Sequence, residues 1–333
     1  MSIEKKQSPF LEVKNLTVHY TSEGKKIHAV NDVSLSLNRG ETLGLVGETG
    51  AGKTTIAKSI LRILPEPPAH VDQGEILLEG KDLLPLPNDE MRKIRGKRIS
   101  MIFQDPMTAL NPVMRIGRQI AEGIQLHEKI SKKEAEEKAK KMLEMVGIPA
   151  SRYKEYPHQF SGGMKQRVVI AMALSCSPDL LLADEPTTAL DVTIQAQVLD
   201  IIKNLQQKMN TSMIMITHDL GIVAEVCDQV AVVYAGEIVE SGSKEEIFDH
   251  PTHPYTVGLF GSLPDIHSEV ERLSPIAGMP PDPSNLPEGC AFSPRCPYAT
   301  RECRQGKVKL ASLGGTHMCR CIRNMKGEGE QHG

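Results

Sequence analysis

A glycine-rich segment near the start of the chain has the residue types needed to bind a phosphate group. Its sequence, GETGAGKTT, fits the pattern G-x-x-x-x-G-K-[ST]. A predicted strand, Glu41 to Val46, precedes it and a predicted helix, Ile56 to Leu64, follows it, which is the context that this pattern requires. Glycines let backbone N–H groups turn toward a phosphate, and Lys53 and Thr54 can reach the phosphate oxygens and a Mg²⁺ ion. The predicted phosphate-binding residues are Gly47, Glu48, Thr49, Gly50, Ala51, Gly52, Lys53, Thr54 and Thr55.

Two adjacent carboxylates follow a strongly apolar segment further along the chain. Leu180–Ala183 is apolar at every position, which predicts a strand buried on both faces, and Asp184 and Glu185 come directly after it. In a protein with a phosphate-binding loop, the first carboxylate can hold Mg²⁺ through water and the second can accept a proton from an attacking water. In isolation the same residues would be an ordinary strand with an acidic turn; the glycine-rich segment upstream favours the functional interpretation.

A second pair of glycines stands at the start of a predicted helix. The sequence SGGMKQ begins at Ser161, and the helix is predicted to end at Ser175. The backbone N–H groups of Gly162 and Gly163 can bind an anion there, although a flexible turn would have the same composition. His218 follows a predicted strand, and a histidine in such a place is more often structural than catalytic.

The order of these segments resembles that of the nucleotide-binding subunits of ABC transporters. SGGMKQ is followed by LLLADEP and then by Thr217-His218, while Tyr20, the Gln104 loop and the Ala189-Leu190-Asp191 loop stand at the corresponding places. The resemblance covers about residues 10 to 245. It implies an α/β fold, in which a RecA-like P-loop core carries an antiparallel β-subdomain and an inserted helical subdomain.

The resemblance also implies how a nucleotide is held. Tyr20 stacks on the adenine and Lys53 binds phosphate. Thr54, Gln104 and Asp184 hold Mg²⁺, and Gln104 senses the γ-phosphate. The implied cofactors are therefore ATP and Mg²⁺.

The remaining roles that the resemblance implies concern catalysis and a second subunit. Glu185 is the general base, and His218 links it to the γ-phosphate. Ser161–Gly163 contacts the nucleotide bound by a partner subunit, and Asp191 crosses the dimer interface. Two chains would enclose two ATP molecules, so that neither chain completes an active site alone.

Three further segments are similar to the dipeptide/oligopeptide importer branch of the family. They are Phe103–Pro112, Ala183–Thr193 and His253-Pro254-Tyr255. The implied function is an ATPase subunit whose ATP hydrolysis drives peptide import. The alternatives are an ATPase of a nickel or glutathione importer, or a soluble ABC ATPase with a cluster-sensing role.

Composition agrees with a protein that does not bind nucleic acid. The 333-residue chain has a net charge of −3, no Trp and only 4% aromatic residues. We find no apolar leader and no membrane-spanning run, and therefore expect a peripheral protein at the cytoplasmic face of the membrane. The partners implied by the resemblance are two transmembrane permease subunits, a second related ATPase or a second copy of this chain, and, indirectly, an extracytoplasmic peptide-binding protein.

Shifts in composition predict where the domains end. We expect a nucleotide-binding domain over residues 1–248, with a helical subdomain at about 106–157. An irregular extension rich in Pro, Gly and Cys is expected over 249–325, and a disordered tail over 326–333.

Five of the seven cysteines lie between Cys290 and Cys321, and thiolates gathered in this way suit an iron–sulfur cluster or zinc. The array, with Pro-Arg-Cys-Pro at 294–297, resembles the extension of the same importers, which can carry a [4Fe–4S] cluster. Zinc is the alternative metal. Cys319 is the alternative to Cys321 as fourth ligand, and Cys176 and Cys227 are expected to be inert buried thiols. The ligands implied are Cys290, Cys296, Cys303 and Cys321.

Overall fold

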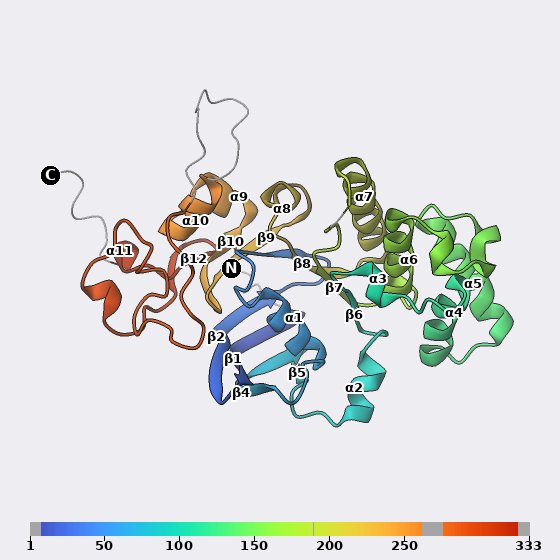
Figure 1. Ribbon diagram of the computed structural model, residues 1–333, viewed down its shortest axis with the longest axis horizontal. Coiled ribbons are helices and arrows are strands. Elements are labelled where there is room, and N and C mark those ends of the chain that lie inside the picture. The colour runs from blue at the N-terminus through green and yellow to red at the C-terminus, as the bar shows by residue number, and fades with distance from the viewer. Residues whose placement is uncertain (1–7, 189, 262–275, 326–333) are drawn as a thin grey trace, which may run out of the picture. The chain divides into compact units, whose positions relative to one another are not determined.

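The computed structural model describes residues 8–188, 190–261 and 276–325 (Figure 1). The predicted tail, 326–333, lies outside the described residues. The chain divides into two compact units that alternate along the sequence. The first contains residues up to Ser36, Leu43–Leu84 and the chain from Thr217 on, and the second contains Leu37–Thr42 and Pro85–Ile216.

One part of the first unit is a four-stranded sheet with the order β2-β1-β4-β5, seen in blue in Figure 1. Strand β4 runs antiparallel to both β1 and β5. The buried residues of β1 are Leu11, Val13, Leu16 and Val18, so the period of two that predicted a strand holds on each side of a register shift between Lys14 and Thr17. The strands are β1 (Leu11–Ser22), β2 (Lys25–Leu37), β4 (Ala69–Leu78) and β5 (Lys81–Asp82).

The other strands of the first unit are hydrogen-bonded in the order β11-β12-β10-β9-β3. Strand β3 is parallel to β9, whereas β9, β10, β12 and β11 pair antiparallel. These strands are β3 (Thr42–Val46), β9 (Gln229–Tyr234), β10 (Glu237–Ser243), β11 (Ala311–Gly314) and β12 (His317–Cys319). The helices are α1 (Lys53–Leu61), α8 (Leu220–Val226), α9 (Lys244–Asp249), α10 (Pro254–Phe260), η3 (Glu302–Arg304) and α11 (Ile322–Met325).

Strands β11 and β12 give the C-terminal extension more regular structure than the sequence predicts. Cys319 pairs with Glu240 and Met318 with Ser241, so that the extension adds a strand to the edge formed by β10. Three or four residues are too few for an alternating pattern to be recognised, and the pairing partner supplies the order instead.

The second unit is built on three parallel strands in which every residue is buried, as predicted for Leu180–Ala183. The strands are β6 (Ile99–Ile102), β7 (Leu180–Asp184) and β8 (Ser212–Ile216). The helices are α2 (Asn88–Ile94), α3 (Pro106–Ala109), α4 (Ile116–His127), α5 (Lys132–Met145), η1 (Ala150–Lys154), η2 (Pro157–Gln159), α6 (Gly162–Leu174) and α7 (Val192–Met209).

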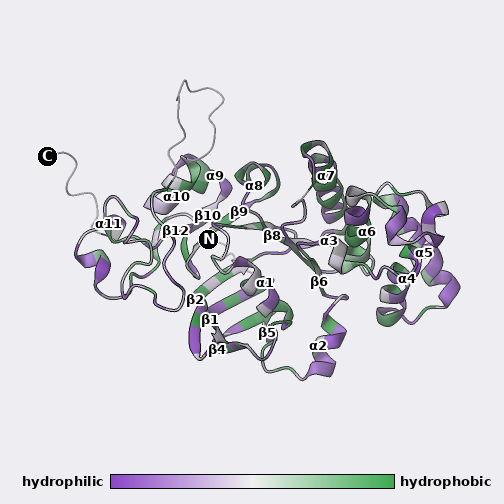
Figure 2. Ribbon diagram, in the orientation of Figure 1, coloured by the Kyte–Doolittle hydropathy of each residue, from purple (hydrophilic) through white to green (hydrophobic). Residues whose placement is uncertain are grey.

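Every element that the structure describes between residues 106 and 157 is helical. Helices α4 and α5 pack side by side (Figure 1). A capping box, in which the side chains of Ser131 and Glu134 bond to each other's backbone N–H, begins α5. Figure 2 shows α5 as mostly hydrophilic, and its buried residues are few: Ala135, Ala139, Met142 and Leu143. Among the described residues, no helix is long and apolar enough to cross a membrane.

We expect Leu182→Ala to lower the free energy of unfolding by about 2–5 kcal/mol, because Leu182 is completely buried in β7 and the change leaves a cavity. Leu126→Ala removes the same atoms from a side chain that is 79% exposed, and should change the stability by less than about 0.5 kcal/mol. Urea unfolding of both variants measures the difference. Equal losses would contradict the assignment of β7 to the core.

Candidate functional site

The glycine-rich segment forms a tight loop between β3 and α1, and two of its glycines are required by close backbone contacts. Gly47 has φ of 148° and Gly52 has φ of 103°. A Cβ atom on Gly47 would lie 2.1 Å from the carbonyl oxygen of Val233, and one on Gly52 would lie 2.3 Å from that of Ala29. Larger residues at these positions would force the loop apart.

Lys53, the first residue of α1, is buried and folds back over the loop. Its Nζ atom donates to the carbonyl oxygens of Gly47, at 2.7 Å, and Glu48, at 2.9 Å. The hydroxyl groups of Tyr20 and Thr55 are 3.4 Å apart. The first unit therefore brings Tyr20, which the sequence places on a separate strand, to the phosphate-binding loop.

The predicted general base, Glu185, lies just after β7 with a positive φ of 46°. Non-glycine residues rarely adopt this conformation, and it is often found at functional sites. The Nε2 atom of Gln104 donates to the Glu185 carboxylate at 3.0 Å, and the Thr188 hydroxyl donates to the same oxygen at 2.9 Å. The second unit thus joins two residues predicted from separate segments. Thr188 was missed by the sequence reasoning, although it lies in the same ADEPTT segment.

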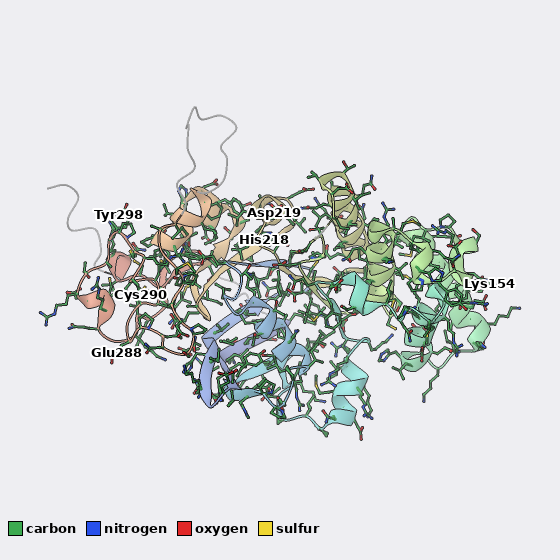
Figure 3. The ribbon with its side chains drawn as sticks, in the orientation of Figure 1. Lys154, His218, Asp219, Glu288, Cys290 and Tyr298 are labelled. Atoms are coloured by element: carbon green, nitrogen blue, oxygen red, sulfur yellow. The ribbon has the colours of Figure 1, made fainter. Side chains whose placement is uncertain are left out.

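His218, labelled in Figure 3, is exposed. It lies in a bend of the chain, and hydrogen bonds fix the residues on either side of it. The Thr217 hydroxyl accepts from the Asp219 N–H at 3.0 Å. The Asp219 carboxylate in turn caps α8 by accepting from the N–H of Gly221 at 2.9 Å. These bonds hold the backbone of His218 on both sides.

The segment Ser161–Gly163 and the residue Asp191 line one surface depression of about 610 Å³ in the second unit. Ser161 caps α6 and Asp191 caps α7, whose Ile194 N–H donates to the Asp191 carboxylate at 3.0 Å. A Cβ atom on Gly163 would lie 2.6 Å from the Ile194 side chain, so glycine is needed for this packing. Two predicted parts of the partner-facing surface therefore share one depression.

The four predicted cluster ligands line one small cavity in the extension. Cys290 and Tyr298, labelled in Figure 3, belong to this segment. Cys319 does not line the cavity; it is fully buried in β12, and its Sγ accepts a hydrogen bond from the Asn324 amide at 3.3 Å. The lining cysteines are Cys290, Cys296, Cys303 and Cys321.

The thiols of this cavity affect one another electrostatically. Burial, and then the nearby Cys321 and Cys303 thiols, raise the pKa of Cys290 to about 11. Burial and the same two neighbours raise the pKa of Cys296. Burial is the largest cause of both shifts and the neighbouring thiols add to it, so both shifts favour the neutral thiol.

The arrangement of the described side chains does not support the predicted metal centre, whether cluster or zinc. Among residues 8–188, 190–261 and 276–325, no group of three or more His, Cys, Asp or Glu side chains is arranged to hold one ion. Zinc sites need all their ligands within about 2.3 Å of one point. The predicted inert thiols, Cys176 and Cys227, are both buried, and burial raises the pKa of Cys227 to about 12.

Two residues that the sequence reasoning did not assign also reach the phosphate-binding loop. Arg295 of the extension bonds to the Glu48 carboxylate, and the Tyr255 hydroxyl accepts from the Glu48 N–H at 3.0 Å. The only local signals for them were the PRCP and HPY sequences, which do not show what they contact.

Comparisons with known proteins agree with this geometry. Residues 30–188 match the model of the family "ABC transporter", and residues 239–303 match "Oligopeptide/dipeptide transporter, C-terminal region". The dipeptide transport ATP-binding protein DppD of Bacillus subtilis is 54% identical over 93% of each chain. The oligopeptide transport ATP-binding protein OppD of Haemophilus influenzae is 51% identical over 94% of this chain and 97% of its own.

Solved structures show the same relationship. The dimeric ATP-binding cassette MJ0796, in a post-hydrolysis state bound to ADP and Pi, is 26% identical with a TM-score of 0.64. The match covers 70% of this chain and 98% of that one. The protein cbiO1 of Clostridium perfringens, part of a cbiONQ transporter complex, is 27% identical with a TM-score of 0.62, over 73% of this chain and 91% of its own.

We expect Gly52→Ala to abolish nucleotide binding, because the new methyl group would meet the Ala29 carbonyl at 2.3 Å and displace the loop. Gly80→Ala is a matched control: Gly80 also has a positive φ, of 79°, but a Cβ there meets nothing within 4 Å. Both changes carry the same kind of backbone strain. Titration with a fluorescent ATP analogue tests them, and equal affinity for the two variants would show that the close contact does not matter.

Proposed function

The chain belongs to the ATP-binding proteins of the ABC transporter family, and on this premise we propose that it hydrolyses ATP to power the import of dipeptides or oligopeptides through a membrane transporter. The loop at Gly47–Thr55 carries the proposal, because it has the sequence of a phosphate-binding loop, lies between β3 and α1, and places Lys53 at the start of α1. The match of residues 239–303, and relatives named for dipeptide and oligopeptide transport, favour peptides over nickel or glutathione.

In the proposed reaction a water molecule attacks the γ-phosphorus of ATP, and ADP leaves with the bridging oxygen. Glu185 accepts the proton of that water. The Gln104 and Thr188 donors hold the carboxylate in one orientation, so that little reorganisation is needed at the moment of reaction. His218 orients the water from its own fixed turn.

The first unit carries the predicted contacts to the adenine and the phosphates. Tyr20 stacks on the adenine, while the loop and Lys53 bind the phosphates. Thr54, Gln104 and Asp184 offer the hydroxyl, amide and carboxylate oxygens that Mg²⁺ prefers, and the ion would neutralise phosphate charge.

We further propose that the active form contains two ATPase chains and two membrane permease subunits, at the cytoplasmic face of the membrane. The depression shared by Ser161–Gly163 and Asp191 is where this chain would contact the nucleotide of its partner. A structural relative is itself a dimer. A peptide-binding protein would supply the substrate from outside. The proposed domains are 1–248, with its helical subdomain at about 106–157, and 249–325.

For the extension we propose a [4Fe–4S] cluster. The proposal rests on four cysteines that line one cavity; in such a cluster each thiolate would bind a different iron, and zinc is the alternative metal. The same lining supports Cys321 over Cys319 as fourth ligand. The bound cluster would supply the positive charge that offsets the gathered thiolates.

Glu185→Gln should lower ATP turnover by about 10²–10⁴-fold while ATP still binds, because the amide cannot accept the proton but can keep its hydrogen bonds. Steady-state ATPase assays on the assembled transporter and ATP titrations on the isolated chain measure the two effects. Glu155→Gln is the control: Glu155 pairs with Arg152 on the surface of the same unit, and turnover should stay near normal. Near-normal turnover of Glu185→Gln would refute the role of Glu185.

Anaerobically purified protein should be brown and contain about four iron and four sulfide per chain. Cys321→Ser should remove the colour and the iron, whereas Cys319→Ala should keep both, since Cys319 lies outside the cavity. Analysis of iron and acid-labile sulfide in each variant measures whether the cluster is retained. One zinc per chain without sulfide, or loss of colour in Cys319→Ala alone, would contradict the proposed site.

A further inference from the structure

The second residue of the phosphate-binding loop, Glu48, is held by the C-terminal extension. Arg295 Nη1 lies 3.1 Å and 3.0 Å from the two carboxylate oxygens of Glu48. The arginine side chain is only 6% exposed, against 28% for the glutamate. A charge-assisted pair with one partner almost fully buried is screened less by water than a surface pair.

Arg295 is itself fixed by the first unit, so its position does not depend on Glu48 alone. Its Nε donates to the carbonyl of Ala277 at 3.1 Å and its Nη2 to that of Ile276 at 3.3 Å. Nη1 also donates to the Tyr234 hydroxyl at 3.3 Å. These three acceptors therefore hold the guanidinium group in position independently of the Glu48 carboxylate.

A second contact from the extension acts on the backbone of the same residue. The Glu48 N–H donates to the Tyr255 hydroxyl at 3.0 Å. Tyr255 packs in a cluster of aromatic rings, with centroids 4.5 Å from Tyr234 and 5.5 Å from Phe292. Arg295 and Tyr255 therefore hold both the side chain and the main chain of Glu48.

The charge on Glu48 makes this contact matter for nucleotide binding. Lys53 bonds to the Glu48 carbonyl, so the glutamate is next to the group proposed to bind phosphate. A free carboxylate there would repel the polyanionic nucleotide, and Arg295 offsets that charge.

We propose that Arg295 is a positioning residue for the phosphate-binding loop, which compensates the charge of Glu48 and fixes the first half of the loop from the cysteine-bearing segment. Arg295 directly precedes Cys296, so the segment that carries the thiols also carries this contact. The proposal rests on the proposed binding of ATP at this loop.

Binding of a fluorescent ATP analogue to the full chain, purified anaerobically, tests the proposal through a double-mutant cycle. Arg295→Met should weaken binding roughly tenfold, since it leaves the Glu48 charge uncompensated. In a Glu48→Gln background, whose own affinity is the reference, Arg295→Met should have almost no further effect. A residue that only supports the fold would not be rescued by removing the charge of Glu48.

Two more variants separate this effect from loss of folding. Arg98→Met breaks another arginine–carboxylate pair, with Asp179 in the second unit, and should leave ATP affinity unchanged. Tyr255→Phe keeps the ring and removes only the hydroxyl, and should weaken binding about threefold even if Arg295→Met is poorly folded. Thermal unfolding of each variant accompanies the titrations.

Additive losses in the double mutant, or unchanged affinity in both Arg295→Met and Tyr255→Phe, would overturn the proposal. The proposed function has a separate control in Lys53→Ala. If the unmodified chain binds no ATP, or if Lys53→Ala binds ATP as tightly as the unmodified chain, the proposal that ATP binds at this loop is wrong. That conclusion would not depend on the Arg295 variants. If Lys53→Ala abolishes binding and the cycle is additive, only the role of Arg295 fails.

Discussion

A loop that binds phosphate with its backbone N–H groups must have its carbonyl groups and charges satisfied from behind. In this chain the Ala51 carbonyl accepts from the Gly236 N–H at 2.9 Å. Lys53 bonds to the carbonyls of Gly47 and Glu48. The support comes from the turn after β9, from α1 and from the extension, which explains why these distant segments meet around one loop.

The extension reaches the loop because it is built into the first unit through a buried carboxylate. Glu240 on β10 is fully buried, and its oxygens accept from the N–H groups of Thr252, at 2.7 Å, and His253, at 2.9 Å. The His317 Nε2 lies 2.8 Å from the same carboxylate. A buried charge of this kind is tolerated only when it is hydrogen-bonded. These bonds tie β12 and the start of α10 to β10, and so place Tyr255.

In the second unit, the proposed reactive carboxylate is held at the end of a buried strand. Glu185 leaves β7 with a positive φ, while its N–H still donates to the Ile216 carbonyl at 2.9 Å. Two donors, Gln104 and Thr188, meet at one carboxylate oxygen. The strained backbone is therefore stabilised by hydrogen bonds on both the main chain and the side chain.

The sequence by itself determined the parts of the protein that depend on local pattern. The phosphate-binding loop, the apolar strand before Asp184 and the capped start of α6 are each encoded within a few neighbouring residues. Their order along the chain was enough to predict the fold class and the residues of the candidate site.

Only the tertiary structure decided which side chains from distant segments meet. Arg295 and Glu48 are 247 positions apart, and no periodicity links them. The sequence left Cys319 and Cys321 as alternatives because they are two positions apart; the pairing of β12 buries the first, and the second lies beyond the strand, at the cavity. Such contacts depend on how separate elements pack, and a pattern within one element carries no information about its neighbour.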